Sequence, residues 1–256
     1  MSHRRTHLIR LGAVILASGT TLGSAAGLAG ATTTSGNSGS SAVPASLAGI
    51  KAKAASDITD RVNDLNGAIA KVNAAKGLGS GQGTLVSYLG TDISPLQQLN
   101  QTIQADSTVH QAAHDFGKIF SDYRVYALVL PASRIAAVAD HATTSAIPSL
   151  SADAAKAQAH VTPANEATLQ PLINDLNNQI GTATSATNGL ASTVLAFTPA
   201  QWNADNSLLV ASRSSSQAAT SALGKGRADV RQIAQDLKSS AGAGLHGHAG
   251  STTTTT

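Results

Sequence analysis

Two histidines, His110 and His114, stand four residues apart, and Asp115 directly follows the second. On a helix this spacing places both imidazole rings on one face, where their nitrogens can bind a transition metal. Gln111 stands where a zinc protease with the HExxH motif carries its catalytic glutamate, so proteolysis is not indicated. The pair predicts a metal site at His110 and His114 that still lacks a third ligand. Two solvent-facing histidines without a metal are the alternative, and the missing ligand favours it.

A second candidate site lies in the bulkiest part of the chain, which contains Asp122, Tyr123, Arg124 and Tyr126. Charged and aromatic side chains in this combination can bind a polar ligand or a protein partner. The alternative is structural, because aromatic rings fill wide core layers and a charged neighbour can pair with an adjacent helix. We therefore expect these four residues to contribute either to such a site or to packing.

Catalytic chemistry is not indicated anywhere in the sequence. The chain has no cysteine, which excludes a thiolate nucleophile, and it has a single glutamate, Glu166. Its aspartates are scattered, so no pair of catalytic carboxylates is evident. The glycine-rich segment 77–83 lacks the preceding strand and the following lysine of a phosphate-binding loop. We expect no enzymatic activity and no cofactor.

The formal charge of +3 belongs to the beginning of the chain, where Arg4, Arg5 and Arg10 lie and no acid occurs before Asp57. Without these three arginines, 14 basic and 14 acidic residues remain. A neutral chain without a basic run has no electrostatic attraction for nucleic acid. We therefore expect no nucleic-acid partner.

Residues 1–31 have the three parts of a secretory signal peptide. A short basic start is followed by an apolar stretch over 11–17, and a small-residue region ends in Ala29-Gly30-Ala31, which fits a cleavage site. The alternative is an uncleaved membrane anchor, because 11–31 is about long enough to span a bilayer. In either case we expect the protein to be exported. If the segment 1–31 is not cleaved, we expect the protein to contact a membrane through this segment alone.

Helical periodicity fills residues 44–240, between a flexible polar linker at 32–43 and a disordered tail at 241–256. Apolar positions recur at steps of three and four along 47–72, 85–103, 109–123 and 169–194, and a last stripe runs from Trp202 to Leu237. The glycines of 77–83 predict a turn between the first two stripes, which makes them an antiparallel hairpin. The last stripe predicts one helix of about forty residues, or roughly 60 Å.

Prolines and caps predict where the helices begin. Capping-box patterns at Ser94–Gln97 and Thr198–Gln201 each carry a proline at the first helical position. The segment Arg124–Leu130 has a strand-like composition, but a single strand would have no partner, so we expect it to be helical. Pro131 is then expected to start a new helix, with a kink at Pro148.

Two segments resemble uncharacterised secreted helical proteins of actinobacteria, the high-GC Gram-positive bacteria. They are Asp122-Tyr123-Arg124-Val125-Tyr126-Ala127-Leu128-Val129-Leu130-Pro131 and Thr198-Pro199-Ala200-Gln201-Trp202-Asn203-Ala204. The resemblance implies a bacterial origin and a secreted or cell-envelope setting. It implies no activity.

The sequence therefore predicts an all-α fold, an elongated antiparallel bundle of about five or six helices with coiled-coil-like hairpins. The tetrapeptide Asn63–Asn66 recurs as Asn174–Asn177, which suggests two related hairpins, 44–105 and 163–240, joined by 106–162. Long charge-balanced helices indicate a structural or interaction protein that binds a protein partner or itself. The alternative is an extracytoplasmic binder of a small ligand or a metal ion.

Overall fold

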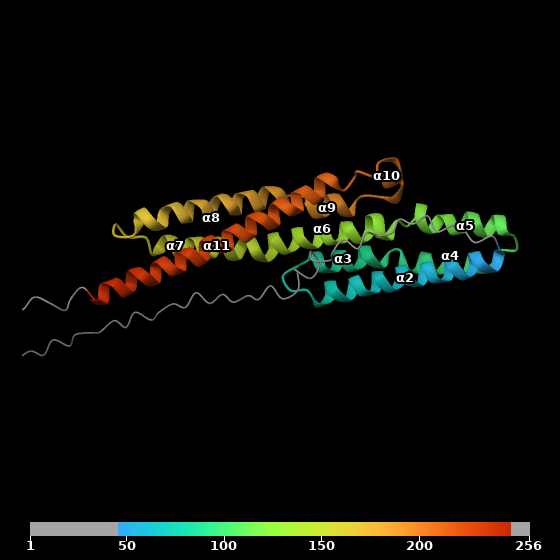
Figure 1. Cartoon of the computed structure of the whole chain (residues 1–256), viewed down its shortest axis with the longest axis horizontal. Helices are drawn as coiled ribbons and strands as arrows, with labels where there is room; N and C mark the ends of the chain where they lie inside the picture. Colours follow the sequence, from blue (N-terminus) through green and yellow to red (C-terminus); the bar gives the residue numbers. More distant parts are fainter. Residues whose placement is uncertain (1–45, 247–256) are drawn as a thin grey trace, which may run out of the picture.

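The computed structural model describes residues 46–246, with side chains from 46 to 240. These residues are mostly helical, with short turns and loops between the helices, and they contain no strand. Figure 1 shows an elongated bundle, with α2 to α5 at one end, α7, α8 and α11 at the other, and α6 between them. The prediction of an elongated all-α bundle is confirmed.

The segments, in chain order, are α2 (Leu47–Ala74), α3 (Gly81–Gly90), α4 (Ile93–Ala105), α5 (Val109–Ser121), η1 (Val125–Val129), α6 (Leu130–His141), η2 (Ala142–Ala146), α7 (Ile147–Ala159), α8 (Glu166–Thr187), α9 (Leu190–Leu195), α10 (Pro199–Ala204) and α11 (Val210–His246). The segments η1 and η2 are π-helical. No helix among residues 46–246 combines the length and the apolarity that crossing a bilayer requires. The predicted signal peptide 1–31 and linker 32–43 lie outside the described residues.

The first core lies where α2 packs against α3 and α4. Its largest side chains come from the predicted stripes, and the fully buried ones there include Ile50, Leu65, Leu85, Leu89, Leu96 and Ile103. Ser46 begins α2 by accepting a hydrogen bond from the Gly49 N–H (3.1 Å). The expected hairpin therefore forms between α2 and the pair α3 and α4. Apolar residues at steps of three and four give each helix one apolar face, and these faces meet in the core.

The second core joins η2, α7, α8 and α11, and alanine makes up a larger share of its buried residues than in the first core. The glycine at position 226 of α11 lies so close to its neighbours that an added Cβ would be 3.1 Å from Leu150 Cδ1 and 3.2 Å from Leu176 Cδ1. Small residues therefore let α11 approach α7 and α8 closely.

One continuous run of helix extends from η1 through α6 and η2 to α7. Each π-helical segment ends two residues before a proline, Pro131 or Pro148. Proline has no N–H and its ring collides with the carbonyl four residues earlier, so an extra residue in the preceding turn accommodates it. The segment 124–130 is helical as predicted, and α6 begins at Leu130 with Pro131 in its first turn, one residue from the predicted start. The α-helix is, however, joined to η1 without a break.

The turn between α2 and α3 packs against η2. Gly77 has φ +79°, and a Cβ added to it would lie 2.8 Å from the Ser145 Cβ atom. The Thr144 hydroxyl donates a hydrogen bond to the Gly77 carbonyl oxygen. Glycine is required here both for the left-handed backbone and for the close approach of the helix.

The apolar face of α5 is rotated from the predicted stripe. Ala112, Phe116 and Ile119 are buried, whereas Val109 and Phe120 are 45% and 41% exposed. Both sets of residues obey steps of three and four, so spacing alone could not separate them. The set with Ile119 faces the core, and Phe120 is left at the surface.

Of three further predicted helix boundaries, two differ from the prediction and one is confirmed. The stripe at 169–194 is broken at Gly189, where φ is +66°, into α8 and α9. The capping box at Ser94 is wrong, because α4 begins at Ile93. The box at Thr198 is confirmed, with the Gln201 N–H donating to Thr198 Oγ1 (3.3 Å) and the Thr198 N–H donating to Gln201 Oε1 (2.9 Å).

The last helix differs at both ends from its prediction. α10 ends at Ala204 and α11 begins at Val210, so Trp202 does not belong to the long helix. α11 has 37 residues and continues to His246, past position 241 where we expected the tail to begin. Residues 247–256 of that predicted tail lie outside the described part.

Candidate functional site

The predicted metal pair His110 and His114 lies on the exposed side of α5. His114 Nδ1 is 3.1 Å from Asp115 Oδ1, and Lys118 Nζ is 2.7 Å from the same oxygen. The hydrogen bond from Lys118 is the main reason why the pKa of Asp115 is lowered. No three His, Asp or Glu side chains converge among the described residues, so these residues provide no third metal ligand.

The four residues predicted as a ligand or partner site separate at the end of α5. Asp122 accepts a hydrogen bond from Ser121 Oγ (2.6 Å) at that helix end, and Tyr123 packs half-buried against the first core. Arg124 has φ +46° and begins the turn into η1. Because the backbone reverses its handedness here, Tyr126 faces a different neighbour from Asp122 and Arg124.

Arg124 is held by α10. Its Nε donates a hydrogen bond to Asn203 Oδ1 (2.6 Å), and Asn203 Nδ2 donates one to the Ser121 carbonyl (2.9 Å). The two segments on which the resemblance rests are therefore in contact. Arg124 has a positioning role at this junction, because the amide of Asn203 joins both sides of the turn.

Tyr126 belongs instead to a cluster around Arg61, a residue of α2 that sequence reasoning missed. The Arg61 guanidinium carbon lies 4.8 Å from the centre of the Phe120 ring and 4.9 Å from that of Tyr126. Arg61 is 7% exposed, and its Nη1 donates to the Asp57 carbonyl (2.8 Å). Burial lowers the pKa of Arg61, while Tyr126 and nearby aspartates oppose the shift.

A signal for Arg61 was present in the sequence. The positions 50, 54, 58, 61 and 65 continue the steps of four and three of the buried stripe, and Arg61 is the one charged residue among them. A charged residue in phase with a buried stripe needs a compensating partner. Here the faces of two aromatic rings supply it through cation–π contacts.

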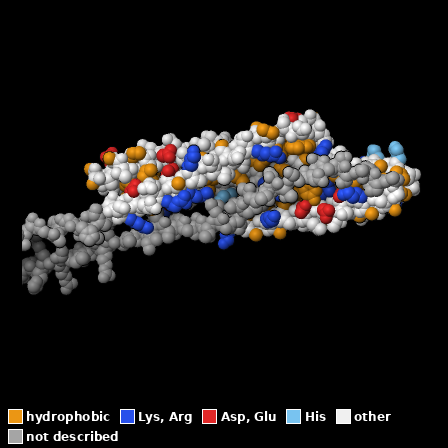
Figure 2. Space-filling model, in the orientation of Figure 1, with side chains coloured by type: hydrophobic (Ala, Val, Ile, Leu, Met, Phe, Trp, Pro, Cys, Tyr) orange, Lys and Arg blue, Asp and Glu red, His pale blue; other side chains and the backbone are white. Residues whose placement is uncertain are grey.

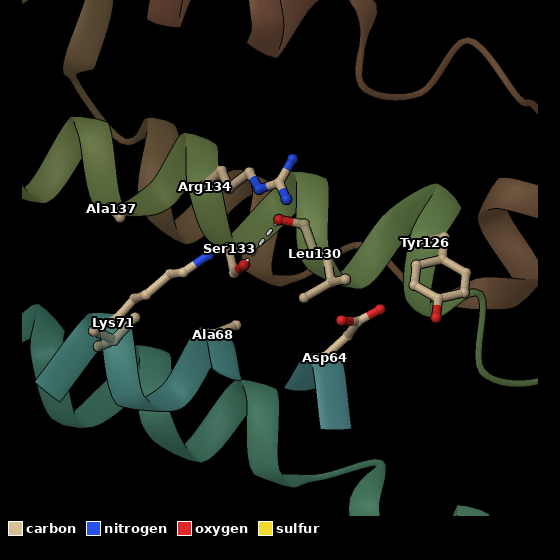
Figure 3. A pocket seen from close by; sticks show the side chains of 9 residues that line it. Asp64, Ala68, Lys71, Tyr126, Leu130, Ser133, Arg134 and Ala137 are labelled. Carbon is tan, nitrogen blue, oxygen red and sulfur yellow. Dashed lines mark hydrogen bonds between the residues drawn. The ribbon is translucent and has the colours of Figure 1, made fainter. Parts of the chain in front are cut away.

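A cavity of about 180 Å³ opens beside this cluster, between α2 and the η1–α6 run (Figure 3). Its polar lining consists of Asp64, Lys71, Tyr126, Ser133 and Arg134, and its apolar lining of Ala68, Val72, Leu130 and Ala137. Ser133 Oγ donates to the Leu130 carbonyl (2.9 Å) within the lining. Burial, and next the hydrogen bond with the Asp64 carboxylate, raise the pKa of Tyr126 to about 12.

No protein-family model, curated protein or solved structure matches the chain. The proposals for its function therefore rest on the residues and on their geometry.

A second titratable cluster contains Asp92 and Tyr88, and the charge of Asp92 also acts on Tyr123. Burial raises the pKa of Asp92 to about 6, and burial together with the Asp92 charge raises the pKa of Tyr88 to about 12. The Tyr88 hydroxyl is buried and has no hydrogen-bond partner among the described residues. This cluster is internal to the first core, so it bears on stability more than on recognition.

The charged side chains do not form one dominant patch on the face that Figure 2 shows. Lysines and arginines are spread along the bundle there, with acidic side chains between them, and histidines lie at the end formed by α5. The rings of Phe120 and Tyr126 are large apolar side chains that remain exposed, and both contact the guanidinium of Arg61.

Proposed function

We propose that this protein is an exported helical interaction protein, secreted or held in the cell envelope, that recognises a protein partner and catalyses no reaction. The observation that supports it is the pair of exposed rings around buried Arg61. Phe120 is 41% and Tyr126 46% exposed, while the guanidinium between them is fixed. We call these three residues the aromatic–arginine cluster.

The residue types of this cluster are those that carry binding energy in protein interfaces. Tyrosine and arginine are enriched at hot spots, and aromatic rings bury a large area at a small cost in side-chain entropy. Arg61 already holds both rings, so little side-chain freedom remains to be lost when a partner covers them. The cluster also joins α2, α5 and η1, which gives it a rigid support.

Site-specific photo-crosslinking in the native host tests this proposal. A benzoylphenylalanine at position 126 or 120 keeps an aromatic ring and should form a discrete adduct with a partner. The matched control is the same residue at position 210, because Val210 is 56% exposed but lies outside the cluster. Adducts of equal yield at all three positions, or none at 120 and 126, would contradict the proposal.

The same experiment can show whether the partner is a second copy of the chain, and a variant tests the role of Arg61. An adduct of twice the mass of the chain would show that the partner is a second copy. Arg61→Ala removes the group between the rings and should reduce the adduct at position 126, provided that circular dichroism shows the helices intact. Fractionation of the host into medium, wall and membrane tests the proposed setting.

The cavity beside the cluster favours a second candidate function, the binding of a small ligand. It combines an apolar lining with a few charged groups, which is the usual composition of such sites. The metal-binding form of this alternative has less support, because the described residues offer His110 and His114 no third ligand. Addition of zinc that leaves the melting temperature unchanged would remove it.

A further inference from the structure

The cavity between α2 and the η1–α6 run carries opposite charges toward its two ends. We propose that it binds a small zwitterion, a molecule with a carboxylate and an ammonium group joined by a short apolar chain. This inference rests on the second candidate function, small-ligand binding, and does not depend on the aromatic–arginine cluster recognising a protein.

The carboxylate end is formed by Lys71 of α2, and Arg134 of α6 is a second cation in the lining, with its guanidinium beside α6 (Figure 3). The ammonium group of Lys71 points across the cavity toward Ser133. Neither cation forms an ion pair with an acid within the described part of the chain. The Lys71 ammonium can form a charge-assisted hydrogen bond with a ligand carboxylate, and the positive charge of Arg134 in the same lining adds to the attraction.

The ammonium end is formed by Asp64, whose carboxylate points along the cavity toward Leu130 and Tyr126 (Figure 3). Asp64 likewise forms no ion pair with the lysines, arginines and histidines of the described residues. A carboxylate here attracts a ligand cation and repels a second ligand anion. A dicarboxylate is therefore disfavoured.

The distance between the two charged ends of the cavity determines how long the ligand should be. Asp64 and Lys71 are two helical turns apart on α2, a rise of about 10 Å. The ligand charges should accordingly be separated by several bonds, further than in an α-amino acid. The four apolar residues of the lining contact the chain. A volume of about 180 Å³ lies below the roughly 300 Å³ at which sites for drug-sized ligands begin, which suits a molecule of metabolite size.

Isothermal titration calorimetry on the full chain tests the inference with four six-carbon probes. They are 6-aminohexanoate, hexanoate, hexylamine and 1,6-hexanediol, which share the same chain and differ in their charged ends. We expect 6-aminohexanoate to bind at least tenfold more tightly than either singly charged probe, and hexanediol to bind most weakly.

Two substitutions assign the ends. Lys71→Gln should weaken 6-aminohexanoate about tenfold and leave hexylamine unchanged, whereas Asp64→Asn should weaken both amines and leave hexanoate unchanged. The matched control for the second is Asp175→Asn, because Asp175 stands in the repeated tetrapeptide of α8, away from the cavity. Lys225→Gln on α11 is the control for the first. All four variants should melt at nearly the parent temperature.

The possible results distinguish a failure of the zwitterion inference from a failure of small-ligand binding at this cavity. If hexanoate or hexanediol binds as tightly as 6-aminohexanoate, the cavity accepts small ligands but does not select a zwitterion, and the inference is wrong. If no probe binds, both the inference and small-ligand binding at this cavity are contradicted. If the control substitutions weaken binding as much as Lys71→Gln and Asp64→Asn do, the ligand occupies another place.

Discussion

The two π-helical segments η1 and η2 have the same relation to a proline and very different surroundings. Each ends two residues before Pro131 or Pro148 within one continuous helix. η1 follows the left-handed Arg124 and brings Tyr126 against Arg61 at the surface. η2 has helix on both sides and lies against the glycine turn.

The comparison separates the cause of a π-helical turn from its use. Proline favours a widened turn at both places, because an α-helical turn would bring its ring against a carbonyl. It does not explain what the widened turn presents. At η1 the extra residue helps place an aromatic ring beside the cavity, and at η2 it places Thr144 and Ser145 against Gly77. Widened turns often occur at functional sites. Whether η1 or η2 contributes to such a site depends on the elements packed against it.

The largest effect is expected from breaking the contact of η2 with the glycine turn. Gly77→Ala places a Cβ atom 2.8 Å from the Ser145 Cβ and strains a backbone at φ +79°. We expect the free energy of unfolding to fall by about 2–4 kcal/mol, measured by urea denaturation. The control is Gly67→Ala, because Gly67 lies inside α2 with open space around it. That variant should gain about 0.5–1 kcal/mol. Equal effects would contradict the proposed close approach.

A smaller effect is expected from the aspartates that accompany the two π-helical segments. Asp92 lies near Tyr123, two residues before η1, and Asp140 lies two residues before η2. Burial raises the pKa of Asp92 to about 6 and also raises that of Asp140. The folded chain therefore binds these protons more tightly than the unfolded chain does. Between about pH 4 and 6 stability should fall as the pH rises, and the loss should persist at pH 7.

Asp92→Asn should remove most of this pH dependence. A pKa of about 6 in place of the ordinary 3.8 corresponds to at most about 3 kcal/mol, and because Asp92 keeps some exposure we expect a gain of about 1–2 kcal/mol at pH 7. The side chain makes no capping hydrogen bond at the start of α4 that the substitution would lose. Urea denaturation at pH 5 and 7 measures the slope. Asp140→Asn should act in the same direction, and an unchanged slope in Asp92→Asn would contradict the assignment.

The long helices of the fold followed from the sequence because their apolar spacing is regular. Leu65, Leu85 and Leu176 each lie on a predicted stripe and are fully buried. The π-helical turns could not be recognised in this way, since one extra residue in a turn leaves the neighbouring spacing almost unchanged. The register of α5 was ambiguous for a related reason, as two stripes of equal regularity competed.

The candidate site was predictable in part. Tyr126 was named from its composition, but its partner Arg61 lies 65 residues earlier, and only the packing of α2 against η1 brings them together. The cavity depends on the same packing, so Lys71 and Arg134 had no shared pattern in the sequence. Local spacing predicts the face on which a residue lies, whereas a site between two helices also depends on where they meet.

The smallest effect is expected from removing the prolines, and it tests whether they alone impose the two turns. Pro148 is exposed, so Pro148→Ala restores an N–H and should raise the free energy of unfolding by up to about 1 kcal/mol. Pro131 is half-buried, and lost packing should cancel that gain in Pro131→Ala. We expect both π-helical turns to persist, because contacts on both sides hold them.

Denaturation of the two variants distinguishes the possibilities. If proline alone imposed the turn, Pro131→Ala would return η1 to an α-helix and rotate the preceding residues by about 100°. Tyr126 would then leave Arg61, and the variant would lose about 2 kcal/mol or more together with the cation–π contact. A neutral Pro131→Ala would instead show that contacts other than the proline keep η1 widened, and the contact of Tyr126 with Arg61 is one of them.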